Sequence, residues 1–372
     1  MDHRERVLAT INLEEPDRVP ISLEFSEIPL KKMFNYYGII NEEEIKRKYG
    51  LGARSYEEGL LSEEVISLYE KLGCDLIHVE PTSPENWQPK KFEDGTWQDE
   101  WGILCKPRVP GTIDWFVHHP IEKYEDLENY EFPDPEAPGR FRLVDDIIKK
   151  YGDKFAIAFG LGWCLFERAW LLRGFVPLIK DMIINPRFVE KLMDKIVEYD
   201  IKIAKLAVER PIDIFRVGDD YGGQERLLIS PSLWRKFIKP RLQKIISIPK
   251  SKGIPVCIHS DGNISSIIKD LIEIGISILN PVQPLALDPI FVKENFGDKL
   301  CLFGTIDIQK TLPFGTPEDV KKEILQRIGT LGQGGGLILA PTHTILPDVP
   351  IENILAMVQT IHKFGKYPLK HF

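Results

Sequence analysis

The sequence predicts an α/β protein of the (β/α)8-barrel class, the TIM barrel. Eight short apolar runs recur along the chain, and each ends in a polar, glycine or proline corner. These runs are rich in β-branched residues, as is typical of parallel strands covered on both faces. Helix-patterned stretches separate most of them, and repeated strand–helix alternation indicates a parallel sheet. The 372 residues are enough for one large barrel with insertions.

The expected strands share this apolar pattern and lie at residues 19–25, 74–81, 155–161, 212–220, 254–262, 276–284, 300–307 and 336–343. Helices are expected at 62–72, 141–151, 185–209, 230–252, 264–275 and 316–331. Thr316 is the expected N-cap of the last of these helices, with Pro317 at its first position. Eight units favour a closed barrel, and a doubly wound open sheet is the alternative.

Two segments depart from a minimal barrel. Residues 82–140 form a long insertion after the second expected strand, and their FEDGTWQDEWGILCKP segment predicts a β-hairpin around an Asp-Gly turn. Residues 162–184 form an extended loop after the third expected strand. Insertions on this side of a barrel can form a lid or a docking surface. We interpret residues 1–372 as a single barrel domain with 82–140 as an inserted lid region.

Composition narrows the class of protein. The formal net charge is −8 and no block of Lys and Arg occurs, which argues against a nucleic-acid partner. The five cysteines are scattered without a Cys-x-x-Cys pair, which argues against a disulfide framework and favours a reducing compartment. The N-terminal segment lacks an apolar signal region, and no run of about 18 uncharged apolar residues predicts a membrane span. We therefore expect a cytoplasmic enzyme.

Polar side chains recur where the expected strands end, which in a barrel is the side of the active site. Each alone is more often a structural hydrogen-bonding group, but their recurrence favours a site. They are Glu24, His78, Glu80, Glu167, Asp219, Asp220, His259, Asp261, Asn280, Gln283, Asp307 and His343.

The sharpest cluster is His259-x-Asp261 with His343. Residues i and i+2 of a strand point to the same face, so His259 and Asp261 can converge. His343, at the end of the last expected strand, would approach from across the barrel mouth. Two imidazoles and one carboxylate suit catalytic zinc, and they also suit non-haem iron. The alternative is a pair of hydrogen-bonding histidines beside an unrelated aspartate.

Three further features of the sequence bear on its function. Asp219-Asp220-Tyr221 offers paired carboxylates for acid–base work, or simply a cap for the turn that follows. The GQGGG segment at 332–336 lacks the Lys-Ser/Thr of a phosphate loop and is interpreted as a tight turn. Tryptophans concentrate in the two insertions, Trp163 among them, and they suit an aromatic-lined pocket or plain packing.

In several segments the chain resembles the uroporphyrinogen decarboxylase superfamily, in particular its corrinoid-linked methyltransferase branch. The resemblance covers nearly the whole chain. Its segments, in order, are RERVLATINLEEPDRVPI, GWCLFERAWLLRGF, VGDDYGGQERLLISPSLWRKFIKPRL, IHSDGNI, LNPVQP, FGTIDIQKTLPFGTPEDVKKEI and GGGLILAPTHTILPDVPIENILAM.

The chain departs from both well-known activities of that superfamily. Decarboxylases carry an arginine-rich N-terminal stretch for porphyrin carboxylates, whereas residues 21–32 here read ISLEFSEIPLKK, without arginine. Their Gly-x-Pro-Trp-Thr loop is replaced by GLGWCLFE. Thiol-directed methyltransferases hold zinc with a His-x-Cys pair and a later Cys. His259 matches the histidine, but Asp261 and His343 stand where the two cysteines would be.

The resemblance therefore implies a methyltransferase that takes a methyl group from a methoxylated aromatic, or another small donor, to the Co(I) corrinoid of a partner protein. The alternatives are a decarboxylase-like lyase, a methylcorrinoid:thiol methyltransferase and a non-catalytic binding barrel. A homodimer is also compatible with the sequence. We expect zinc at His259, Asp261 and His343. The catalytic candidates are Glu167, Asp219, Asp220 and Asp307, and the substrate-binding candidates are Glu24, His78, Glu80, Trp163, Tyr221 and Gln283.

The resemblance also implies a second metal hypothesis. Some aryl-ether-demethylating relatives carry a Glu-x14-Glu-x20-His zinc pattern, and Glu42, Glu57 and His78 have this spacing. Glutamates are abundant in this stretch, so this set ranks below the first.

Overall fold

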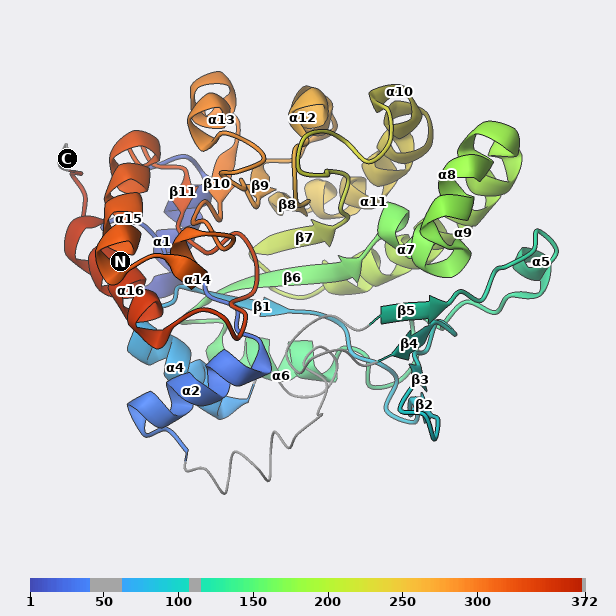
Figure 1. Ribbon diagram of the computed structural model, residues 1–372, viewed down its shortest axis with the longest axis horizontal. Coiled ribbons are helices and arrows are strands. Elements are labelled where there is room, and N and C mark those ends of the chain that lie inside the picture. Colours follow the sequence, from blue (N-terminus) through green and yellow to red (C-terminus); the bar gives the residue numbers. More distant parts are fainter. Residues whose placement is uncertain (41–61, 107–114, 370–372) are drawn as a thin grey trace.

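The computed structural model describes residues 1–40, 62–106 and 115–369. Its centre is a curled parallel sheet whose strands are hydrogen-bonded in the order β1-β6-β7-β8-β9-β10-β11 (Figure 1). The strands are β1 (Leu76–Val79), β6 (Ala156–Trp163), β7 (Ile214–Gly218), β8 (Val256–His259), β9 (Ile278–Asn280), β10 (Cys301–Phe303) and β11 (Leu337–Ile338). In a doubly wound sheet, the spatial order of the strands changes direction at a switch point and so does not follow the chain from one edge to the other. Because this order follows the chain, the alternative of a doubly wound sheet is wrong.

Residues 19–25, the first predicted strand, connect the two edges of this sheet without forming a regular strand. The Leu339 amide donates to the Pro20 carbonyl at 2.9 Å, and the Asp75 amide donates to the Ile21 carbonyl at 2.8 Å. Isolated parallel bridges pair Ile21 with Leu339 and Phe25 with Ile345. Pro20 has no amide hydrogen, so a continuous ladder cannot run through it. The prediction of eight strands is therefore correct for seven runs and wrong for 19–25.

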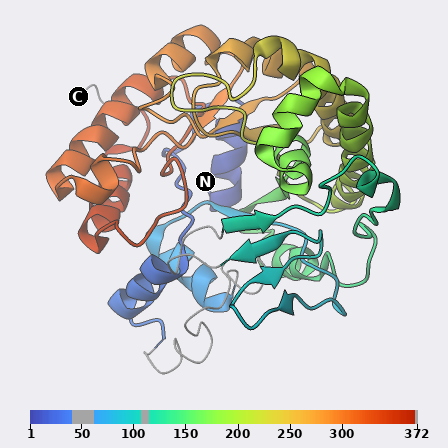
Figure 2. The same ribbon diagram turned by 45° about the vertical axis from the view of Figure 1, so that its right-hand side comes forward.

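The helices surround the sheet (Figure 2). They are α1 (His3–Ile11), α2 (Glu27–Tyr37), α4 (Glu63–Leu72), α6 (Arg142–Tyr151), α7 (Leu165–Arg173), α8 (Phe175–Ile184), α9 (Pro186–Ala207), α10 (Pro231–Leu233), α11 (Lys239–Ser251), α12 (Ile268–Ile274), α13 (Pro289–Phe296), α14 (Thr311–Phe314), α15 (Pro317–Leu331) and α16 (Ile351–Phe364). Thr316 caps α15 as predicted, in a capping box with Asp319. The predicted helix at 230–252 is divided by a π-helical turn at Trp234–Ile238.

Helix α1 packs at the end of the sheet where the strands begin. Its Val7 and Ile11 join a buried cluster with inward-facing side chains from all seven strands, including Ala158, Ile214 and Cys257. Alternate residues of a strand face opposite sides, so one set fills this interior while the other set packs under the helices. The interior is therefore filled at this end, which leaves the ends of the strands for a site.

The insertion between β1 and β6 contains a small antiparallel sheet in the order β2 (Lys90–Lys91), β3 (Trp97–Gln98), β4 (Leu104–Lys106) and β5 (Trp115–His118). Gly95, at φ 81°, lies in the turn that joins β2 to β3. Figure 1 shows this sheet beside the ends toward which β6 and β7 point. The short helix α5 (Asp126–Asn129) follows it.

The segment 162–184 is not the extended loop that the sequence predicts, because most of it is helical. It contains α7 and α8, with Gly174 at φ 92° between them. A positive φ favours glycine, so the chain can change direction here between two helices. Among the described helices, none has the length and hydropathy of a membrane span.

Candidate active site

A cavity of about 440 Å³ opens at the carboxyl ends of the parallel strands. Its lining includes His78 from β1, Trp163 from β6, Arg216 from β7 and His259 from β8. The insertion contributes Trp101, so the cavity has one wall from the barrel and another from the small sheet. Active sites of (β/α)8 barrels lie on this side of the sheet. This cavity is therefore the candidate active site.

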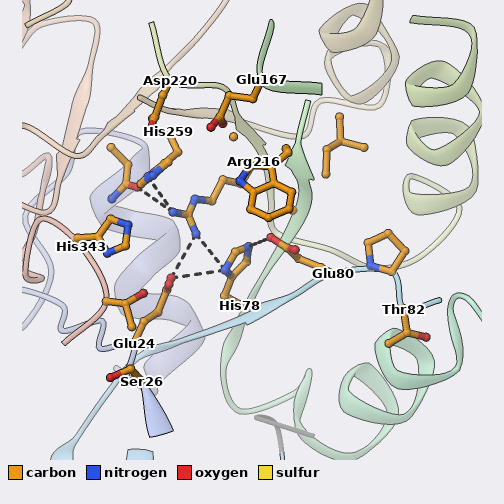
Figure 3. A pocket seen from close by; sticks show the side chains of 18 of the residues that line it. Glu24, Ser26, His78, Glu80, Thr82, Glu167, Arg216, Asp220, His259 and His343 are labelled. Atoms are coloured by element: carbon orange, nitrogen blue, oxygen red, sulfur yellow. Dashed lines mark hydrogen bonds and ion pairs between the residues drawn. The ribbon is translucent and has the colours of Figure 1, made fainter. Parts of the chain in front are cut away.

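The guanidinium of Arg216 is the centre of the polar floor of the cavity, between Glu24 and His78 on one side and His259 on the other (Figure 3). Its Nη1 lies 3.2 Å from Oε1 of Glu24 and 2.9 Å from Nδ1 of His78. Its Nη2 lies 2.9 Å from Nδ1 of His259 and donates to Oδ1 of Asn280 at 3.2 Å. One arginine thus orients four other side chains.

Arg216 fixes the proton of His78. An arginine only donates hydrogen bonds, so Nδ1 of His78 accepts and the ring proton lies on Nε2. Nε2 is 3.4 Å from Oε1 of Glu80. Gly160 makes room for this pair, because a Cβ there would lie 2.5 Å from Nε2 of His78 and 2.8 Å from Oε1 of Glu80.

Glu24 is held as a carboxylate. Burial acts to raise its pKa, but the positive charge of Arg216 and the contact with His78 outweigh burial, and the pKa lies well below its ordinary value. The carboxylate and the guanidinium therefore balance each other on the floor of the cavity.

His259 is held as a neutral imidazole. Burial, together with the positive charge of Arg216, lowers its pKa to about 3. Asn280 donates from Nδ2 to the Phe303 carbonyl at 3.1 Å, which leaves its Oδ1 as an acceptor 2.7 Å from Nδ1 of His259. Because Oδ1 of Asn280 can only accept, Nδ1 of His259 carries the ring proton, and Nε2 is the ring nitrogen available to a ligand.

Two aspartates join His259 in the strongest candidate metal group. One ligand atom each from Asp220, His259 and Asp261 lie within 4.8 Å of one another. The Asp261 amide donates to Oδ1 of Asp220 at 2.8 Å. Burial and the neighbouring charge of Asp220 raise the pKa of Asp261 to about 6. Burial is also the main cause that raises the pKa of Asp220.

His343 lies beside this group, within the cavity lining. Its ring centroid is 6.3 Å from that of His259. The sequence predicts metal ligands at His259, Asp261 and His343. The structure brings His259 and Asp261 together with Asp220, whereas His343 lies beside this group and is not one of the three whose ligand atoms converge.

Glu167 lines the cavity from the first turn of α7 and is 7% exposed. Burial raises its pKa well above its ordinary value, and the charges of Asp220 and Asp219 raise it further. This shift favours the protonated form of Glu167, which is the form that a general acid needs.

Two other predicted site residues, Asp219 and Tyr221, lie behind the cavity wall that Glu167 lines. Asp219 is fully buried and accepts hydrogen bonds from the amides of Phe166 at 2.9 Å and Glu167 at 2.7 Å. The hydroxyl of Tyr221, also fully buried, donates to Asp219 at 2.8 Å. Asp219 thus caps α7 from a neighbouring strand end, and neither residue lines the cavity.

Asp307 and Gln283 are likewise outside the cavity lining. Asp307 accepts from the amides of Gln309 at 2.8 Å and Thr311 at 3.1 Å, where α14 begins. Gln283 accepts from the Gly262 amide at 3.0 Å and donates to Gln309 at 2.8 Å. Both fix loops around the site.

The other predicted substrate-binding residues, Glu24, His78, Glu80 and Trp163, all line the cavity. Sequence reasoning missed Arg216 and Arg168, and it assigned Asn280 no role. A signal for Arg216 was present, because it is the single charge inside the apolar IFRVG strand. The second metal hypothesis names Glu42, Glu57 and His78 as ligands. Glu42 and Glu57 lie outside the described residues, and His78 belongs to the Arg216 network.

Two curated proteins of different activity are similar to this chain in sequence. A curated uroporphyrinogen decarboxylase from Geotalea daltonii is 23% identical over 69% of this chain and 74% of its own length. The methylcobamide:CoM methyltransferase MtaA from Methanosarcina barkeri is 28% identical over 50% of this chain and 55% of its own length.

A solved structure has the same fold. The structure of a methyltransferase from Methanosarcina mazei has a TM-score of 0.72 at 23% identity, over 98% of this chain and 99% of that one. The family model of uroporphyrinogen decarboxylase (URO-D) matches residues 109–364. This match covers more than half of the sequence, so the chain belongs to the uroporphyrinogen decarboxylase (URO-D) family.

Proposed function

We propose that the protein is a methyltransferase that moves a methyl group from a methoxylated aromatic to the corrinoid of a partner protein. The observation that carries this proposal is the group of Asp220, His259 and Asp261 beside Glu167, a buried carboxylic acid. The first supplies ligands for a hard cation, and the second supplies a proton. Similarity to the methyltransferase MtaA supports methyl transfer as the reaction class.

The donor set fits zinc. Zinc in catalytic sites is held by three protein ligands, with histidine and carboxylate among the common types. We assign these roles to Nε2 of His259 and to carboxylate oxygens of Asp220 and Asp261, with His343 as the alternative third ligand. Without thiolate ligands, such a zinc would act as a Lewis acid toward an ether oxygen. A neutral His259, as its lowered pKa requires, suits ligation.

Cleavage of an aryl methyl ether needs a stabilised leaving oxygen. The electron pair of the C–O bond stays on that oxygen, while the electron pair of Co(I) forms the new bond to the methyl carbon. In this proposal Glu167 donates its proton to the oxygen, so the aromatic product leaves as a phenol. General acid catalysis of this kind contributes about 10²–10⁴ in rate.

An aromatic donor is favoured by the walls of the cavity. Trp163, 38% exposed at the cavity rim, packs edge-on against Phe116 at 5.4 Å. Trp101 and Tyr199 also line the cavity and pack edge-on at 4.7 Å. A cavity of about 440 Å³ is within the range that small-molecule sites occupy.

A decarboxylase-like lyase is the second candidate, because curated decarboxylases match 69% of the chain. It would require binding of several porphyrin carboxylates. Two of the arginines that line the cavity, Arg140 and Arg216, are paired with Glu100 and Glu24. Methyl transfer to a thiol is the third candidate, and the ligand set of carboxylates and imidazole argues against it.

One experiment separates these candidates. The zinc-loaded protein is mixed with a Co(I) corrinoid protein and a panel of methoxybenzoates, guaiacol, methylamines and methanol, and the visible spectrum is followed. We expect the spectrum to change only with methoxyarenes. Turnover of uroporphyrinogen, or transfer from a methylcorrinoid to a thiol, would support the second or third candidate. Inactivity toward every methyl donor would refute the proposal.

A further inference from the structure

A second arginine of the cavity wall, Arg168 on α7, takes no part in the Arg216 network. It is 8% exposed and lines the cavity. Its Nε and Nη1 are buried and have no hydrogen-bond partner among residues 1–40, 62–106 and 115–369. Burying a charged donor without an acceptor is costly. In a cavity wall, such a group indicates that a ligand supplies the acceptor.

The guanidinium of Arg168 is held in place by an aromatic face. Its central carbon lies 3.9 Å from the ring centroid of Trp101. Stacking covers a face of the guanidinium and leaves its N–H edge for hydrogen bonds. Trp101 is itself fixed, because its carbonyl accepts from the hydroxyl of Tyr130 at 2.6 Å and its amide donates to Asp99 at 3.0 Å. The arginine is therefore presented rigidly before any ligand arrives.

Two carboxyl groups, those of Asp99 and Asp200, lie close enough to affect Arg168 electrostatically, but neither forms a hydrogen bond or ion pair with it in the described part of the chain. Burial raises the pKa of Asp99 to about 6 and that of Asp200 to about 7. Near neutral pH Asp200 therefore carries only part of its negative charge, and neither acid completes the hydrogen bonds of Arg168.

The other arginines of the cavity differ from Arg168. Arg140 makes two hydrogen bonds to Glu100, at 3.0 and 2.8 Å. Arg216 is engaged by Glu24 and Asn280. Arg140 and Arg216 are thus each paired with a carboxylate, whereas the side chain of Arg168 makes no hydrogen bond or ion pair with any residue that the structure describes. A ligand in the cavity would therefore supply the hydrogen-bond acceptors that Arg168 lacks.

We propose that Arg168, stacked on Trp101, forms a carboxylate subsite, so that the ligand of this cavity is a small aromatic acid. The planar guanidinium matches the geometry of a carboxylate, and the stacking indole and Tyr199 suit an aromatic ring. Glu167 and Arg168 both line the cavity, so a ligand held by its carboxylate at Arg168 shares the cavity with the acid. That this ligand is the methyl donor rests on the proposed function, whereas the carboxylate subsite does not.

Binding to the purified protein, without any corrinoid partner, tests the subsite. Calorimetry compares 4-methoxybenzoate with 4-methoxybenzamide, which has nearly the same shape but no charge. We expect the wild type to bind the acid about tenfold or more tightly than the amide, and Arg168→Met to lose this preference. Arg168→Lys keeps the charge without the planar fork, so an intermediate preference is expected even if Arg168→Met does not fold.

Arg210→Met is the matched control. Arg210 also stacks on an aromatic ring, Phe141 at 4.2 Å, and pairs with Asp145, but it does not line the cavity. This variant should keep the preference for the acid. Equal binding of acid and amide by the wild type, no binding of either, or an unchanged preference in the Arg168 variants would overturn the proposal.

The two proposals fail separately. An Arg168-dependent preference for the acid without methyl transfer from any methoxyarene would retain the subsite and refute the methyltransferase. Methyl transfer that is equally fast from charged and neutral methoxyarenes, and unaffected by Arg168→Lys, would retain the methyltransferase and refute the subsite.

Discussion

The backbone amide of Glu167 donates to the buried carboxylate of Asp219 at 2.7 Å, so one acid holds the other in the cavity wall. Asp219 also accepts from the amide of Phe166, and thereby caps the start of α7. The two carboxyl groups have different roles, because Glu167 lines the cavity whereas Asp219 lies behind it. The following substitutions separate these roles.

Removing the cap should destabilise the protein. Asp219→Ala leaves the first amides of α7 without their acceptor, and losing a helix cap costs about 1–2 kcal/mol. Activity should fall as well, because α7 carries Glu167. Urea unfolding followed by circular dichroism measures the change in the free energy of unfolding. A free energy equal to that of the wild type would contradict the capping role.

Glu167→Gln should slow methyl transfer without destabilising the protein. We expect methyl transfer to slow by about 10²–10⁴, because the proton donor is lost. Since the pKa of Glu167 is raised in the folded chain, that chain keeps a proton which the unfolded chain releases. The wild type therefore loses stability as the pH rises past the ordinary pKa of a glutamate, about 4.3. Glu167→Gln removes this loss.

Unfolding measured at several pH values checks that sign. The stability advantage of Glu167→Gln over the wild type should be small near pH 4 and grow as the pH rises toward neutrality. A constant difference across this range would mean that Glu167 does not hold its proton in the folded chain.

Gly160→Ala should disturb the floor of the cavity. A Cβ there would lie 2.5 Å from Nε2 of His78, so either the ring or the strand must shift. Overpacking of this kind costs about 1–3 kcal/mol. Gly329, in α15, has open space around it, and Gly329→Ala should stabilise the protein by roughly 0.5–1 kcal/mol. Thermal unfolding of both variants is the comparison, and equal effects would contradict the crowding at Gly160.

Metal binding should depend on the neighbourhood of His259. We expect the wild type to retain about one zinc per chain after dialysis, and His259→Ala to bind it about 100-fold or more weakly. His118, exposed on β5, offers a control in His118→Gln. Elemental analysis and a competing chelator measure both variants. Zinc that is absent from the wild type, or held equally by His259→Ala, would contradict the assignment.

Much of the fold could be predicted from the sequence, because its signals are local. Short apolar runs identify the parallel strands, and the Thr316-Pro317 pair identifies the start of α15. The first run failed as a strand because Pro20 interrupts the ladder. The segment 162–184 was misjudged because the cap of α7 comes from Asp219, remote in sequence.

The candidate site was predictable only in part. Polar residues at strand ends identify the side of the barrel, so Glu24, His78 and His259 were found. Which strand-end acids line the cavity depends on packing, and so Asp307 and Asp219 could not be told from Glu167. The environment of Arg168 required the tertiary structure, because Trp101 reaches it from the insertion.

Methyl transfer to a corrinoid is tested most directly in a single-turnover reaction. Zinc-loaded protein, a Co(I) corrinoid protein and 4-methoxybenzoate are mixed rapidly, and the visible spectrum of the corrinoid is recorded with time. We expect a methylated corrinoid and a phenol in equal amounts with the wild type, and neither with His259→Ala. No methylated corrinoid from any methoxyarene, or formation at the same rate with His259→Ala, would contradict it.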